Sequence, residues 1–272
     1  MRRSSARGTH RVRPLRHVAP RHALRAWPEI ARGIARSGTH ALLLDFDGTL
    51  VSIRQTPEEV RCPPRTRRLL RRLAGLPNIQ VGMISGRRAR PLERMVGVRG
   101  LHYHGVCGAE ANGRMVAIRP STERTLIRAR RALQARLDGL PGVRIEDKGV
   151  SFTVDFRGAR KAVMRSAAGA LDLALAGARR TLRVVKGAKT WDVVPRELEG
   201  KGAAVRTVMR GLPHGTMGIY IGDDAADEPA FRALPRGITV RVGRTGKTFA
   251  RYWLRGPAEV FEFLTRIEEA LQ

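Results

Sequence analysis

The chain has 272 residues, of which 42% are hydrophobic and 28% are charged, as in an ordinary folded protein of one large or two modest domains. No apolar stretch reaches the roughly 18 residues that a membrane-spanning helix needs, so we expect no association with a membrane. The two cysteines, Cys62 and Cys107, are too few for a disulfide framework and favour a reducing, cytoplasmic location.

A formal net charge of +28 indicates attraction to anions, which are either small substrates or a nucleic acid. The basic residues are mostly arginines spread along the whole chain, and they are not interleaved with the aromatic residues that stack on bases. We therefore expect no specific nucleic-acid partner. A basic nucleic-acid-binding protein is kept as the alternative from a different functional class.

The first 37 residues are rich in arginine and contain a single acid, Glu29. They lack the apolar segment of a secretory signal, so a disordered basic tail over residues 1–37 is favoured over an organellar transit peptide. Residues 27–36 are expected to form a short helix at the end of this tail.

An apolar run at residues 41–44 leads directly into Asp45, Asp47 and Gly48. A short apolar run that stops in turn residues predicts a buried strand of a parallel sheet, and such sheets bind ligands at the carboxyl ends of their strands. Two acids at that place are costly to bury without a partner, and a divalent cation would supply one. The alternative is a plain type I turn at Asp47-Gly48.

A second strand is predicted over residues 79–85. It ends in Ser85-Gly86-Arg87, where the serine hydroxyl and a free backbone N–H suit a phosphoryl oxygen. Taken alone this tripeptide is common, but its position one strand and one helix after the paired acids favours a functional role.

The composition of the sequence and its pattern of predicted elements change between Pro120 and Pro195. Alternating strands and helices rich in alanine and arginine predict an open-faced α/β domain inserted over residues 120–195. The predicted helices are 123–137 and 161–176, and the predicted strands are 143–146, 151–156, 182–186 and 190–194.

After the insert, charged residues again lie where regular elements begin or end. Lys201 lies at the start of a predicted helix, where backbone N–H groups and a lysine together favour an anion. A strand over 217–221 ends in GDDAADE, whose acids repel one another unless a cation lies nearby. A strand over 237–242 and an amphipathic helix over 258–271 close the chain. The acids of the turn are Asp223, Asp224, Asp227 and Glu228.

In one parallel sheet these charged segments meet at the same edge. The stretches LLLDFDGTL, ISGR, GVCGAE, EDKGVSFTVDFR, WDVVP, GKG and IGDDAADEPAF resemble the trehalose-6-phosphate phosphatase family of the haloacid dehalogenase (HAD) superfamily. The resemblance covers nearly everything after residue 40. It implies an α/β fold, in which residues 38–119 and 196–272 form a Rossmann-like parallel-sheet core and residues 120–195 form a cap domain that sets substrate specificity.

The resemblance implies a phosphoric monoester hydrolase that converts trehalose 6-phosphate to trehalose and phosphate, a step of trehalose biosynthesis. Asp45 would be the nucleophile that forms an aspartyl-phosphate, and Asp47 would protonate the leaving sugar oxygen and then activate water. Ser85 and Lys201 would hold the transferring phosphoryl group. Mg²⁺ would be bound by Asp45, the backbone carbonyl of Asp47 and Asp223, with Asp224 and Asp227 behind them.

For the substrate, the resemblance implies binding by Gly86, Arg87, Glu146, Lys148, Arg157 and Asp192. Three positions depart from the family pattern: Cys107 and Asp155 stand where His is usual, and Asp192 replaces Glu. The alternative substrates are therefore other sugar phosphates, such as sucrose 6-phosphate or a mannosyl-phosphoglycerate. A catalytically silent regulatory domain is disfavoured because Asp45 and Asp47 are both present. We expect a monomer, with functional coupling to a trehalose-6-phosphate synthase as a possible relation.

Overall fold

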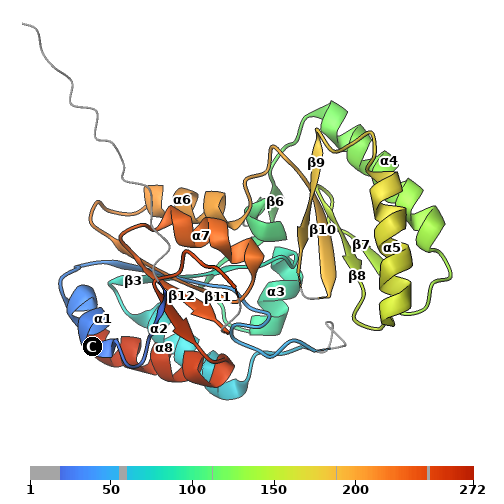
Figure 1. Cartoon of the computed structure of the whole chain (residues 1–272). Helices are drawn as coiled ribbons and strands as arrows, with labels where there is room; N and C mark the ends of the chain where they lie inside the picture. The colour runs from blue at the N-terminus through green and yellow to red at the C-terminus, as the bar shows by residue number, and fades with distance from the viewer. Residues whose placement is uncertain (1–18, 55–59, 112, 188, 244–245) are drawn as a thin grey trace, which may run out of the picture.

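The computed structural model describes residues 19–54, 60–111, 113–187, 189–243 and 246–272. These residues form two sheets with helices packed against them (Figure 1). The larger sheet has nine strands in the order β1-β13-β12-β11-β2-β3-β4-β5-β6, and the smaller has four in the order β7-β8-β10-β9. No helix in the described part of the chain is long and apolar enough to cross a membrane.

The larger sheet is parallel from β1 through β4, and β5 and β6 extend it as antiparallel strands. Because β11, β2 and β3 are neighbours, the three segments that follow these strands emerge side by side at one edge. The strands are β1 (Arg21–His22), β2 (His40–Leu44), β3 (Ile79–Ile84), β4 (His102–Gly105), β5 (Glu110–Ala111), β6 (Arg114–Met115), β11 (Met217–Gly222), β12 (Ile238–Val242) and β13 (Tyr252–Leu254).

Helices cover both faces of this sheet. Leu42 and Leu44 of β2 pack in a cluster with α1, α2, α3 and α8, whereas Leu43 packs on the opposite face with α6 and α7. A strand buried on both faces is apolar throughout, which explains the run that precedes Asp45. The helices are α1 (Trp27–Ala35), α2 (Pro64–Gly75), α3 (Ala89–Val96), α6 (Lys201–Arg210), α7 (Glu228–Ala233) and α8 (Pro257–Leu271).

The smaller sheet is antiparallel, and its helices α4 and α5 lie on the side that faces away from the larger sheet (Figure 1). Phe152 and Val154 of β8 pack against these helices, whereas Thr153 between them lines the cleft toward the larger sheet. This alternation is typical of a sheet with one buried face. Its elements are α4 (Pro120–Leu137), β7 (Arg144–Asp147), β8 (Phe152–Asp155), α5 (Lys161–Ala174), β9 (Leu182–Lys186) and β10 (Thr190–Pro195).

The predicted disordered tail over residues 1–37 is too long. Residues 1–18 lie outside the described residues, but β1 pairs with β13 at the edge of the larger sheet, and α1 packs against α8. Ile30 of α1 is buried, and the Trp27 ring meets Phe263 edge-on with 5.7 Å between ring centres. Apolar spacing therefore outweighs the basic composition that suggested disorder. The helix predicted at the end of the tail is confirmed.

The other predicted strands and helices are present, with ends within three residues of those expected. The sequence analysis missed α3, β1, β5, β6 and β13, which are all short. Helix α4 begins at Pro120 and β10 ends at Pro195, the two residues that marked the limits of the predicted insert. The role of this insert as a specificity cap stays a prediction.

Candidate active site

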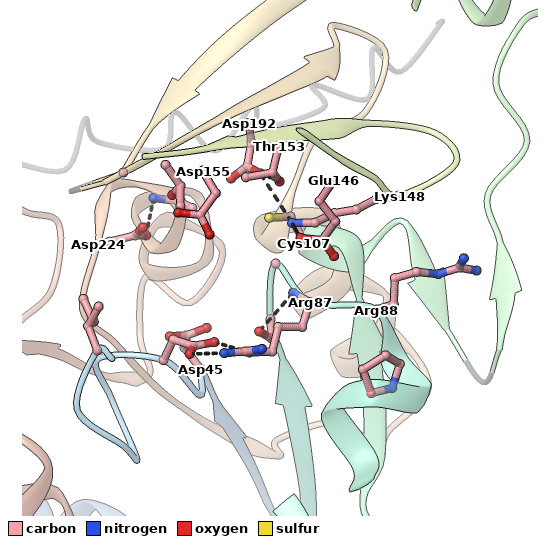
Figure 2. Close-up of a pocket in the computed structure, with 18 of the residues that line it drawn as sticks. Asp45, Arg87, Arg88, Cys107, Glu146, Lys148, Thr153, Asp155, Asp192 and Asp224 are labelled. Carbon is pink, nitrogen blue, oxygen red and sulfur yellow. Dashed lines mark hydrogen bonds and ion pairs between the residues drawn. The ribbon is translucent and has the colours of Figure 1, made fainter. Parts of the chain in front are cut away.

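Three adjacent strands of the larger sheet end at a cleft. Asp45 follows β2, Ser85 follows β3 and Asp223 follows β11. Lys201 reaches the same place from the first residue of α6. All four side chains line a cleft of about 790 Å³ between this sheet edge and the smaller sheet. Figure 2 shows Asp45 in this cleft. The parallel topology thus brings together the residues that are far apart in the chain.

Asp45 is bound by a lysine deep in the cleft. The Asp45 side chain is 6% exposed, and Lys201 Nζ donates to Asp45 Oδ1 and to Asp227 Oδ1, both at 2.7 Å. Burial by itself would lower the pKa of Lys201, but the carboxylates of Asp227 and Asp45 outweigh it and raise this pKa well above its ordinary value. Lys201 is therefore a fixed positive charge beside Asp45, and it is suited to neutralise a phosphoryl oxygen.

The acidic turn after β11 is held by its own hydrogen bonds. Asp227 is fully buried; Tyr220 donates to Asp227 Oδ1 at 2.7 Å, and the backbone N–H of Asp224 donates to Asp227 Oδ2 at 3.0 Å. Asp224 in turn accepts from the N–H of Ala226 at 2.7 Å, which completes a capping box. The carboxylate of Glu228 is bound by Arg241 at 3.0 Å, so this acid has a structural partner.

Asp45, Asp223 and Asp227 form an acidic cluster in which each offers one oxygen within 4.8 Å of the others. Burial raises the pKa of Asp45, and burial together with the charges of Asp227 and Asp224 raises the pKa of Asp223 to about 7. A Cβ on Gly48 would lie 2.0 Å from Asp223 Oδ2, so the glycine leaves the room that this carboxylate occupies. Buried carboxylates with one lysine among them fit a divalent cation, which prefers oxygen ligands.

Asp227 and Asp47 differ in how they lie relative to the acidic cluster. Asp227, which was placed behind the ligands, contributes an oxygen to the acidic cluster, although both of its oxygens already accept hydrogen bonds from the protein. The Asp47 side chain lies outside the cluster and pairs with Arg87, with two N–O distances of 2.6 Å. Asp45 accepts from Lys201 through Oδ1 and from Thr49 through Oδ2, the latter at 3.4 Å, so hydrogen bonding alone does not separate it from Asp227 as a ligand.

Ser85 lies on the floor of the cleft and is 2% exposed. Its Oγ accepts from the backbone N–H of Arg87 at 3.2 Å, which leaves the hydroxyl proton for an oxygen in the cleft. Its backbone carbonyl accepts from the N–H of Cys107 at 2.8 Å. Burial raises the pKa of the Cys107 thiol to about 12, so this residue lines the cleft as a neutral group beside Gly86.

The smaller sheet supplies the opposite wall of the cleft. Lys148 Nζ lies 3.5 Å from Asp192 Oδ1 and 3.8 Å from Glu146 Oε2. The Thr153 hydroxyl donates to the same oxygen of Asp192. Figure 2 shows Lys148, Thr153 and Asp192 close together across the cleft from Asp45. This wall presents paired charged donors and acceptors to the cleft.

Asp155 and Arg157 lie next to these residues. Asp155 accepts from the backbone N–H of Arg157 at 2.9 Å, and it lies 3.8 Å from the guanidinium groups of both Arg157 and Arg144. The sequence analysis missed Thr153 and Arg144, although strand alternation could have found them, because both occupy the face opposite their apolar neighbours. It also missed Tyr220, whose neighbours in β11 are apolar and gave no signal.

Comparison with known proteins identifies relatives over most of the chain. Residues 43–247 match the family model of trehalose-phosphatase. A trehalose-phosphate phosphatase of Mycobacterium bovis is 30% identical over 250 residues, which cover 85% of this chain and 62% of the relative. A probable trehalose-phosphate phosphatase C of Arabidopsis thaliana is 26% identical over 245 residues, which cover 83% and 76%. The chain thus spans less than two thirds of the mycobacterial relative's length.

Solved structures agree on the fold. The C-terminal domain of a Candida albicans trehalose-6-phosphate phosphatase superposes with a TM-score of 0.77 at 22% identity, covering 89% of this chain and 96% of that domain. A trehalose-6-phosphate phosphatase related protein gives 0.66 at 24% identity, covering 84% and 97%. The predicted α/β core with an inserted α/β unit is therefore confirmed as a HAD fold. The family model matches residues 43–247, which are more than half of the chain, and this match shows that the chain belongs to the trehalose-phosphatase family.

Proposed function

We propose that the chain is a magnesium-dependent phosphatase that hydrolyses trehalose 6-phosphate to trehalose and phosphate. The observation that carries this proposal is the contact of Lys201 with Asp45, a member of the acidic cluster that lines the cleft. The opposite wall carries charged side chains suited to sugar hydroxyls, and membership of the family supports trehalose 6-phosphate as the substrate.

In the first step, an oxygen of Asp45 would attack the phosphorus, and the bond between the phosphorus and the sugar oxygen would break. Asp47 would give its proton to that oxygen, so trehalose leaves as a neutral alcohol. In the second step, Asp47 would take a proton from the water that attacks the aspartyl-phosphate, which releases phosphate and restores Asp45. Ser85 and Lys201 would hold the phosphoryl oxygens throughout.

The cation that we propose for the acidic cluster is Mg²⁺, held by Asp45, Asp223 and the backbone carbonyl of Asp47. When bound, it would neutralise negative charge on the phosphoryl oxygens and on the carboxylates. Asp224 and Asp227 would stay behind these ligands. Asp224 caps the acidic turn, and Asp227 holds Lys201 in place.

Five of the residues predicted to bind substrate keep that role in this proposal. Lys148 lies within 3.8 Å of two of the carboxylates among them, so a sugar hydroxyl that enters between them meets donors and acceptors together. The residues are Gly86, Glu146, Lys148, Arg157 and Asp192. A different sugar phosphate, such as sucrose 6-phosphate or a mannosyl-phosphoglycerate, is the second candidate substrate. Two residues of the wall formed by the smaller sheet that depart from the family pattern support it: Asp192 accepts a hydrogen bond from Thr153, and Asp155 accepts one from the backbone of Arg157.

The proposal is tested by measuring phosphate release from trehalose 6-phosphate, glucose 6-phosphate and sucrose 6-phosphate, with Mg²⁺ and with EDTA. A preference for trehalose 6-phosphate that is lost in EDTA is the expected result. Activity that EDTA abolishes, without this preference, supports the second candidate. No activity on any of the three contradicts the phosphatase and favours the basic nucleic-acid-binding protein.

We also propose that the protein acts as a cytoplasmic monomer beside a trehalose-6-phosphate synthase, the kind of enzyme that would make its substrate. Cys62 and Cys107 are both free thiols, which fits a reducing compartment. Light scattering after size exclusion measures the oligomeric state, and a stable dimer at micromolar concentration contradicts the monomer.

A further inference from the structure

The sequence predicted Arg87 as a substrate ligand, but its guanidinium faces a catalytic carboxylate. Arg87 Nε donates to Asp47 Oδ2 and a terminal nitrogen donates to Asp47 Oδ1, both at 2.6 Å. The two side chains are 15% and 24% exposed, so the pair is partly shielded from water. Two parallel N–H···O bonds fix the orientation of a carboxylate as well as its position.

Arg87 itself is held at several points along its length. Its backbone N–H donates to Ser85 Oγ at 3.2 Å, and its backbone carbonyl accepts from the N–H of Val106 at 2.8 Å. The guanidinium carbon lies 5.9 Å from the centre of the Phe46 ring, within the range of a cation–π contact. The Arg87 guanidinium that binds Asp47 is therefore held in place by contacts within the protein, independently of any ligand.

We propose that Arg87 is a positioning residue that acts through Asp47, rather than a ligand of the sugar. The inference rests on the proposed phosphatase chemistry, in which Asp47 moves a proton in each step. The paired hydrogen bonds from Arg87 keep the Asp47 side chain apart from the acidic cluster, where its charge would add to that of three neighbouring carboxylates. They also restrict Asp47 to one orientation at the mouth of the phosphoryl site.

At least one of the two hydrogen bonds between Arg87 and Asp47 can persist throughout the reaction. When Asp47 is protonated, one oxygen carries the proton to the sugar oxygen while the other still accepts from the guanidinium. When Asp47 is ionised, both oxygens are bound, and the carboxylate is held where it takes the proton of the attacking water. Arg87 exchanges no proton with substrate or water in either step.

The test compares Arg87→Gln with the wild-type chain. Arg90→Gln is the matched control, because it makes the same change on an exposed side chain three residues further along the same segment. With the sugar phosphate that the wild type hydrolyses best, Arg87→Gln should lower kcat roughly 100-fold and leave KM within about threefold. Arg87→Lys keeps the charge but not the paired bonds, so it should recover only part of the rate.

A second substrate isolates the effect on proton transfer. p-Nitrophenolate leaves without a proton, so the burst of p-nitrophenol from p-nitrophenyl phosphate should change less than about threefold in Arg87→Gln. The burst also reports that the variant is folded. In the Asp47→Asn background, Arg87→Gln should leave the burst of p-nitrophenol unchanged. The constant for inhibition of this burst by the sugar phosphate should also stay the same, because the two residues act as a unit.

One result would overturn the inference: Arg87→Gln raises the KM of the sugar phosphate about tenfold or more in the wild-type background, and raises its inhibition constant by the same factor in the Asp47→Asn background. This pattern would make Arg87 a substrate ligand, as the sequence predicted. Loss of the burst in Arg87→Gln would also overturn it. The proposed function fails separately, if the wild-type chain hydrolyses none of the sugar phosphates.

Discussion

The two walls of the cleft differ in how completely they are built before a ligand arrives. On the wall formed by the larger sheet (the core wall), Lys201 lies 2.7 Å from its two carboxylates, and all three side chains are 6% exposed or less. On the wall formed by the smaller sheet (the cap wall), Lys148 lies 3.5 Å from Asp192 and 3.8 Å from Glu146, and the Glu146 side chain is 58% exposed. The core wall is thus preorganised, whereas the cap wall leaves hydrogen-bonding capacity for a ligand.

This difference follows from the two sheets. The core site lies at the ends of parallel strands that are buried on both faces, where an unpaired charge is too costly to persist. The cap wall is the open face of an antiparallel sheet, where water can bind the polar groups that the protein leaves without a partner. In the proposed function, the chemistry would therefore depend on the core wall, and substrate choice would depend on the cap wall.

The largest expected effect is the loss of the nucleophile. Asp45→Asn should lower turnover of every phosphate ester by at least about 10⁴-fold, because no aspartyl-phosphate forms. The melting temperature should change little, since burial opposes the charge of Asp45 and Lys201 keeps its contact with Asp227. Steady-state kinetics and thermal denaturation check both statements. Retained activity in a folded variant would remove Asp45 from the mechanism.

Crowding of the acidic cluster should have the next largest effect. Gly48→Ala places a Cβ 2.0 Å from Asp223 Oδ2, so the carboxylate has to move and the affinity for Mg²⁺ should fall roughly tenfold or more. Activity against Mg²⁺ concentration measures this shift.

Gly100→Ala is the matched control for Gly48→Ala. Gly100 has a φ of +84°, close to the +81° of Gly48, but nothing lies within 4 Å of its added Cβ. Both variants should lose about 1–2 kcal/mol of stability from left-handed backbone strain. An equal loss of Mg²⁺ affinity in both would show that strain, rather than crowding of Asp223, is responsible.

The cap wall should affect substrate choice but not chemistry. Lys148→Met keeps most of the buried stem but removes the charge beside Asp192 and Glu146, so kcat/KM for the sugar phosphate should fall roughly 10–100-fold. The value for p-nitrophenyl phosphate should stay within about threefold. Lys161→Met, on the exposed start of α5, serves as the control. Equal losses on both substrates would contradict the division of labour between the two walls.

The smallest expected effect is a pH-dependent gain of stability from the cation. The folded-state pKa of Asp223 is about 7, above the ordinary value of about 4, so between these values the folded metal-free protein binds the extra proton. Its stability should therefore fall as pH rises through this window. Mg²⁺ competes with that proton and should raise the melting temperature more at pH 8 than at pH 6. Asp223→Asn should remove the difference; a cation effect independent of pH in the wild type would contradict the role of Asp223.

Much of the core site was predictable because its signals are local. An apolar run that stops at an acid predicts a buried strand and its end, and parallel pairing then places Asp45, Ser85 and Asp223 at one edge. The cap was less predictable. Its strand order and open face determine that Thr153 binds Asp192, and these residues are 39 positions apart.

The sequence by itself therefore determined the elements, their order and the identity of the acids and the lysine at the strand ends, since period and turn residues act over a few neighbours. Only the tertiary structure decided which charges pair. It placed Asp47 on Arg87, 40 positions away, and Asp227 on Lys201, 26 positions away. It also made β1 and α1 part of the fold. Pairing depends on side-chain direction and on the cost of burying a charge, and both are fixed only when distant strands and helices pack together.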